Sequence, residues 1–234
     1  MNGLRDRVGW SAAILGLLIL TATIIASCGG TQANVDPKAL LAECSANMKK
    51  MQGFHFVYEA HRPASEKPPS GIQVDRVIGD VNAQGSIKAD VYVTYSGSPL
   101  TIPFIQIGSV QYIKVGLWQT VKASDSPVGA LDVSAGTVRI LDKITGVTYV
   151  GQEKRAGAQT YHLKGTVAGA EVAALAGVVT TTQPFPTDLW IGVKDQLIYE
   201  VDITGPTSPD ENPKIRRSII LSNFNHAPAI NAPK

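Results

Sequence analysis

The sequence predicts an α+β protein in which an antiparallel sheet of about ten short strands carries helices on one face. Most of the chain after residue 53 alternates apolar and polar residues with a period of two, as half-buried strands do. Helical spacing occurs only in isolated stretches between strands, which excludes the regular strand–helix alternation of Rossmann and TIM-barrel folds. With 234 residues, 44% of them hydrophobic, the chain is long and apolar enough to bury one substantial core.

Charge and cysteine content exclude several classes of protein. The 21 Lys and Arg residues nearly balance the 19 Asp and Glu residues, so the net charge of +2 is too small for nucleic-acid binding by phosphate neutralisation. Two cysteines cannot build a disulfide framework or a structural zinc site. Charged residues make up 17% of the chain, against about 25% in an average soluble domain, so the protein is poor in charge.

The N-terminus resembles a bacterial lipoprotein signal. Two arginines precede an uncharged stretch over 8–26, and small residues then lead to a cysteine in Ile25-Ala26-Ser27-Cys28. This motif is similar to a lipobox, which implies cleavage before Cys28 and a diacylglyceryl thioether on its sulfur. We therefore expect a signal peptide over 1–27, then lipidated Cys28 and a tether over 28–35, with the protein anchored on the extracytoplasmic face of the cell membrane. The alternative is an uncleaved anchor, because the uncharged stretch approaches the roughly 20 residues that span a bilayer.

The main domain, expected over 36–225, begins with a helix. Asp36 is a suitable N-cap, Pro37 is a suitable first helical residue, and Gly53 marks the end. Apolar residues follow one helical face at spacings of three and four: Leu41, Cys44, Met48 and Met51. With Cys28 lipidated, Cys44 has no intramolecular disulfide partner, and we expect it to be a buried apolar residue.

The rest of the domain alternates as short strands separated by turn residues. Shorter helices are predicted over 137–144 and 169–176, and an irregular tail over 226–234. The predicted strands cover 54–61, 72–81, 85–95, 100–107, 110–115, 118–121, 145–154, 160–167, 188–193, 197–204 and 214–225.

Candidate catalytic and metal-binding residues are few. His55, Glu59 and His61 alternate onto one face of the first strand and could approach a metal ion. The aromatic residues on the opposite face must be the buried ones, so we favour a solvated His/Glu face. The sequence holds no nucleophile elbow, P-loop or zinc-protease motif, and we expect neither an enzyme nor a cofactor. One residue of the Arg216-Arg217 pair must face outward, either to meet an anionic headgroup or simply to be solvated.

Several stretches carry a resemblance that covers most of the domain. They are Gly85-Ser86-Ile87-Lys88-Ala89, residues 110–115 with Trp118, residues 142–150 and 161–165, Thr187-Asp188-Leu189-Trp190-Ile191 and Leu221-Ser222-Asn223-Phe224-Asn225. These stretches are similar to actinobacterial cell-envelope lipoproteins of the LppX/LprAFG type, which share a fold with the LolA/LolB lipoprotein carriers. The resemblance implies a half-barrel sheet curled around helices, with an apolar cavity that holds the acyl chains of a lipid or glycolipid. The loops over 63–71 and 205–213 look expanded and charged, so the cavity mouth and the choice of headgroup are expected to differ.

The residue pattern is compatible with such a cavity, because one good helix and two short ones leave much of a ten-strand sheet to cover. The aliphatic residues expected to line it are Val91, Val93, Ile105, Ile107, Ile113, Val115, Leu141, Ile144, Leu189, Ile191, Val201 and Ile203. The alternative interpretation of each is plain core.

We therefore expect a monomeric, lipid-anchored protein that carries lipid or glycolipid within the cell envelope. Its expected partners are the lipid, the membrane through the anchor, and a membrane exporter or acceptor protein. The alternative is a structural or signalling lipoprotein that works through protein contacts and has no lipid ligand.

Overall fold

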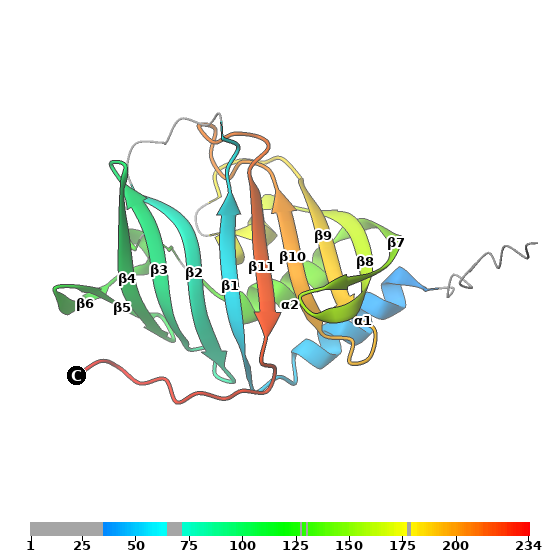
Figure 1. Cartoon of the computed structure of the whole chain (residues 1–234), viewed down its shortest axis with the longest axis horizontal. Coiled ribbons are helices and arrows are strands. Elements are labelled where there is room, and N and C mark those ends of the chain that lie inside the picture. Colours follow the sequence, from blue (N-terminus) through cyan, green and yellow to red (C-terminus); the bar gives the residue numbers. More distant parts are fainter. Residues whose placement is uncertain (1–34, 65–71, 127, 130, 177–178) are drawn as a thin grey trace, which may run out of the picture. The chain divides into compact units, whose positions relative to one another are not determined.

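The computed structural model describes residues 35–64, 72–126, 128–129, 131–176 and 179–234 (Figure 1). The predicted signal peptide, Cys28 and almost all of the predicted tether lie outside the described residues. So do most residues of the expanded loop over 63–71.

The described strands form one antiparallel sheet of eleven, in the order β6-β5-β4-β3-β2-β1-β11-β10-β9-β8-β7 (Figure 1). Neighbours in the sheet are neighbours in sequence except where β1 pairs with β11, which joins two meanders into one surface. The strands are β1 (Gly53–His61), β2 (Ile72–Asn82), β3 (Ile87–Tyr95), β4 (Ser98–Ile107), β5 (Val110–Val115), β6 (Leu117–Val121), β7 (Thr145–Arg155), β8 (Ala158–Val167), β9 (Phe185–Gly192), β10 (Ile198–Thr204) and β11 (Arg216–Ser222). The predicted α+β class with an antiparallel sheet is confirmed.

In the described part of the chain, three α-helices and one short 3₁₀ helix accompany the sheet: α1 (Pro37–Met48), η1 (Ala123–Asp125), α2 (Val133–Lys143) and α3 (Gly169–Ala176). The Asp36 side chain caps α1 by accepting a hydrogen bond from the Lys38 backbone N–H, as the sequence predicts. Helix α2 begins at Val133 rather than at 137, because the Asp132 carboxylate accepts from the Ala135 backbone N–H and caps an extra turn.

The two faces of the sheet differ in what covers them. Phe56 of β1 lies opposite Gly79 of β2 and Leu221 of β11, and its side chain is wholly buried. It belongs to one apolar core with Leu41 of α1 and Ile140 of α2. We call this helix-covered side of the sheet the inner face and the opposite side the outer face. Figure 1 shows the sheet curling, with α1 and α2 behind it, so the expected half-barrel is confirmed.

A polar contact joins the first two helices. Asp142 of α2 accepts hydrogen bonds from the Ser45 hydroxyl at 2.6 Å and from the Lys49 ammonium at 3.0 Å. The Ser45 hydrogen bond, with help from Lys49, lowers the pKa of Asp142 below its ordinary value. Cys44 of the same helix is fully buried, as predicted, and burial raises the pKa of its thiol.

The C-terminal tail is irregular over residues 226–234, and Figure 1 shows it running along one end of the strands. It packs closely against the start of β1. A Cβ at Gly53 would lie 2.2 Å from the His226 carbonyl oxygen, and the φ of Gly53 is +151°. Only glycine therefore fits at this point.

Candidate functional site

The inner face of β2–β6 carries no charged side chain among the described residues. Register places Val77 opposite Val91, Val91 opposite Ile102, and Phe104 opposite Ile113, all on this face. Counting along each strand from these pairs, the only hydrogen-bonding side chains on the inner face of β4–β6 are a serine and three glutamines. Such a surface offers contact to hydrocarbon and very little to a charged ligand.

Part of this face is covered by the chain that leads into α2. Gln106 of β4 donates to the Leu131 carbonyl at 2.8 Å, and Gln111 of β5 donates to the Gly129 carbonyl at 2.7 Å. Both glutamines are buried, so they hold the loop by its backbone.

Beyond that loop, the described residues leave part of the inner face exposed. Five large apolar side chains of this face are about half exposed or more. We call them the apolar rim: Ile72 (52% exposed), Tyr95 (51%), Leu100 (49%), Val115 (59%) and Leu117 (79%). Isolated exposed apolar residues are ordinary, but a row along neighbouring strands of one face marks an interaction surface.

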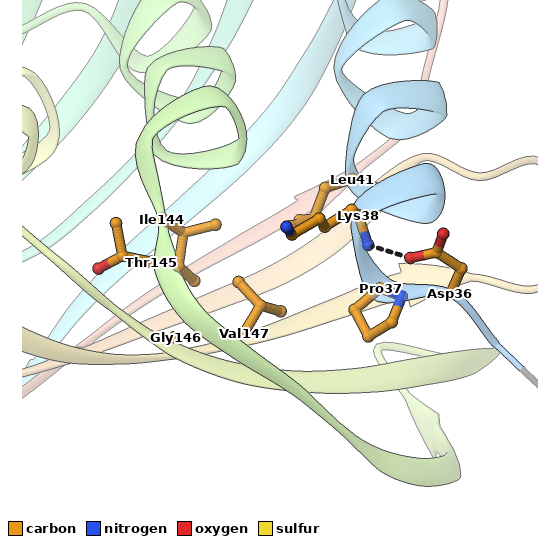
Figure 2. A pocket seen from close by; sticks show the side chains of 8 residues that line it. All are labelled: Asp36, Pro37, Lys38, Leu41, Ile144, Thr145, Gly146 and Val147. Atoms are coloured by element: carbon orange, nitrogen blue, oxygen red, sulfur yellow. Dashed lines mark hydrogen bonds between the residues drawn. The ribbon is translucent and has the colours of Figure 1, made fainter.

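A pocket of about 430 Å³ lies at the other end of the molecule, between the start of α1 and the start of β7 (Figure 2). Leu41 of α1 faces Ile144 and Val147 across it, which makes an apolar interior. The Lys38 side chain extends from α1 toward Ile144, and Asp36 lies at the edge of the pocket.

Most residues predicted to line a cavity lie on the inner face or on α2. Ile144 lines the pocket in Figure 2. Ile113 is half-buried against the core, and Val115 belongs to the open rim. Seven others are almost fully buried within the core: Val91, Val93, Leu141, Leu189, Ile191, Val201 and Ile203.

The face assigned to Ile105 and Ile107 is corrected by the pairing of β4. Ile105 lies opposite Lys88 and Tyr112, and Ile107 lies opposite Val110, all on the outer face. Strand β4 is apolar on both faces, so alternation alone could not choose between them.

A buried ion pair fixes the loop over 205–213 that the sequence singled out. The Arg217 guanidinium, 3% exposed, contacts both Glu211 carboxylate oxygens at 2.6 Å and donates to the Gly205 carbonyl at 2.8 Å. The Thr207 hydroxyl and backbone N–H also donate to Glu211. Burial raises the pKa of Glu211, but the contacts with Arg217 and Thr207 lower it by more, so the pKa lies below its ordinary value.

The two adjacent arginines therefore point to opposite sides of the sheet. Arg217 points to the inner side, while Arg216 faces outward and donates hydrogen bonds to Asp202 and Ser218.

The outer face carries a network that sequence reasoning missed. The His162 ring lies between Glu153 at 3.1 Å and Asp188 at 2.6 Å, and it stacks on Trp190 with ring centroids 4.6 Å apart. The Arg155 guanidinium lies over the Trp190 ring at 4.5 Å. Alternation places all five residues on one face of β7–β9, but only register shows that they meet. The network ties three strands together.

The histidines of β1 also pair on the outer face, as the buried aromatic face predicts. The His55 ring contacts Asp80 at 2.9 Å, and the His61 ring contacts the Ser218 hydroxyl at 3.1 Å. Glu59 pairs with Arg76 at 3.0 Å.

Among the described residues, no group of three or more His, Cys, Asp or Glu side chains is arranged to hold a metal ion. Within the same part of the chain, none of the helices has the length and apolar character needed to cross a bilayer.

Known proteins resemble this chain in sequence and in fold. The family model for LppX_LprAFG lipoproteins matches residues 36–226. The fold is similar to that of LprF from Mycobacterium bovis, with a TM-score of 0.65 and 17% identity over 84% of this chain and 96% of that one. It is also similar to that of the Mycobacterium tuberculosis lipoprotein LppX, with a TM-score of 0.58 and 20% identity over 84% of this chain and all of that one. No curated protein matches the sequence.

Proposed function

The chain belongs to the LppX_LprAFG lipoprotein family, and we propose that it binds the acyl chains of a lipid or glycolipid and carries that lipid within the cell envelope. The observation that carries the proposal is the inner face of β2–β6, which has no charged side chain and is left partly open. The pocket of Figure 2 supplies a second apolar site, with Lys38 in its lining available to an anionic headgroup.

Acyl binding to such surfaces is favourable without any chemistry. Each buried methylene group contributes about 0.8 kcal/mol, so ten of them contribute about 8 kcal/mol before the entropy of ordering the chain is subtracted. The protein needs no cofactor for this task. In this proposal a lipid on Cys28 holds the domain beside the membrane from which its ligand comes.

The test uses the full-length acylated chain purified in detergent from bacterial membranes, with lipid content measured by native mass spectrometry and organic extraction. Val147→Trp fills the pocket and should lower the bound lipid several-fold. Val150→Trp is the matched control, because Val150 lies on the same strand, is 48% exposed and does not line the pocket.

Two results would contradict parts of this proposal. Full lipid content in Val147→Trp would show that the lipid does not bind in the pocket and would leave the inner face of β2–β6 as its site. Absence of stoichiometric lipid from the wild type would contradict a carrier and favour a lipoprotein that acts through protein contacts. The same spectra test the anchor, since a lipidated chain beginning at Cys28 has a defined mass.

A further inference from the structure

The apolar rim ends at the tip of the β5–β6 hairpin. Val115 and Leu117 lie opposite each other on either side of Gly116, so both side chains project from the same face of the tip. Leu117 is 79% exposed, the highest exposure among the large apolar residues that the structure describes. On the other face of the hairpin Lys114 lies opposite Trp118. An aliphatic tip with tryptophan and lysine beside it is the composition of segments that sit in a membrane interface.

The tip of the β5–β6 hairpin carries positive charge only. No acidic residue occurs between Asp90 and Asp125, and the exposed Lys114 lies two residues before Gly116. This stretch without acidic residues includes all of β4, β5 and β6. Lysines near an anionic lipid surface are attracted by its negative potential, and their stems can lie along apolar surface with the ammonium in water.

Three residues of the rim lie side by side across β2, β3 and β4. Ile72 of β2 lies opposite Tyr95 of β3, and Leu100 of β4 lies opposite Val93, next to Tyr95 on the same face. From this edge the uncharged inner face continues inward through Ile102 and Ile113, which pack against the core. A lipid that left a bilayer at the rim would therefore meet no charged group along β2–β6.

We propose that the apolar rim docks the domain on the surface of an anionic phospholipid bilayer, with Val115 and Leu117 entering the acyl region and Lys114 facing the headgroups. The inference rests on the proposed function, because docking there opens the inner face to the lipid that the protein carries. It assigns to the β5–β6 hairpin the contact through which ligand enters and leaves.

The test places a fluorophore at the tip of the full-length acylated protein. Leu117→Cys can be labelled selectively, because Cys44 is fully buried and Cys28 is expected to be acylated. Ala83→Cys is the matched control, since Ala83 is an exposed residue of the turn between β2 and β3, at the opposite end of β3 from Tyr95. Both proteins are reconstituted into vesicles of phosphatidylglycerol and phosphatidylcholine that contain spin-labelled lipid.

The label at 117 should be quenched several-fold more than the label at 83 and should shift to the blue. Reversing the charge at the tip with Lys114→Glu should reduce that difference, as should vesicles of phosphatidylcholine alone. Equal quenching at 117 and 83 overturns docking. A dimer by native mass spectrometry with no quenching at 117 also overturns it, because a second copy then covers the rim.

Lipid content of the same preparations separates this inference from the proposed function. Stoichiometric lipid without quenching at 117 overturns docking and leaves the carrier intact. Quenching at 117 without bound lipid supports docking and contradicts the carrier.

Discussion

At the scale of single residues, neighbouring side chains on a strand point to opposite faces of the sheet and differ in burial. Arg216 and Arg217 are adjacent in sequence, yet one is partly exposed on the outer face and the other is buried against Glu211. The sequence predicts that the two diverge but not which one is buried, because the partner comes from a loop. Ile105 and Ile107 show the same limit, since β4 is apolar on both faces and only its pairing with β3 decides which side is covered.

Arg217→Met should lower the free energy of unfolding by about 3–5 kcal/mol, because it leaves the Glu211 carboxylate buried without its cation. Urea unfolding of the purified protein measures the change. Arg76→Met is the control: Arg76 and Glu59 pair at the surface, 47% and 34% exposed, and their loss should change stability by less than about 1 kcal/mol. Equal effects of the two substitutions would contradict a buried role for Arg217.

At the scale of elements, the strands and two of the helices are predictable because their patterns are local. Strand β3 alternates Ile87, Ala89, Val91 and Val93 on one face, and all four are buried. Helix α2 is longer than its apolar periodicity indicates, because the cap at Asp132 lies beyond a turn with little hydrophobic signal. The open rim was not predictable, since exposure of Leu100 and Leu117 depends on where the helices and the loop before α2 end.

The loop over 205–213 should loosen at acidic pH. The pKa of Glu211 is lower in the folded protein than its ordinary value of 4.5, so its ionised form stabilises the fold. That contribution is complete above pH 4.5 and disappears as the pH falls through the lower folded pKa. The difference in unfolding free energy between wild type and Glu211→Gln should therefore be constant near neutral pH and shrink in acid. A difference independent of pH would show that Glu211 is not ionised in the fold.

At the scale of the whole molecule, the low charge content has a spatial explanation. Outer-face side chains such as Glu153, Arg155 and Asp188 form ion pairs, whereas the inner face of β2–β6 has no charge among the described residues. The helices cover only part of that inner face. Strands β2–β6, which keep their charges on one side and leave the other partly uncovered, separate a solvated surface from one suited to hydrocarbon.

A ligand that completes this core must also stabilise it. A lipid that binds only the folded state, at a free concentration about one hundred times its dissociation constant, adds about 2.7 kcal/mol to the unfolding free energy. For a chain of this length that corresponds to a rise in Tm of about 5–10 °C. Calorimetry of the delipidated full-length protein, with and without added fatty acid, should show this rise. Val147→Trp should abolish most of it, because the indole ring occupies the pocket between α1 and β7, while Val150→Trp should keep it. A wild-type Tm unchanged by any lipid would mean that the core is complete without a ligand, and that the open rim serves contacts with other molecules alone.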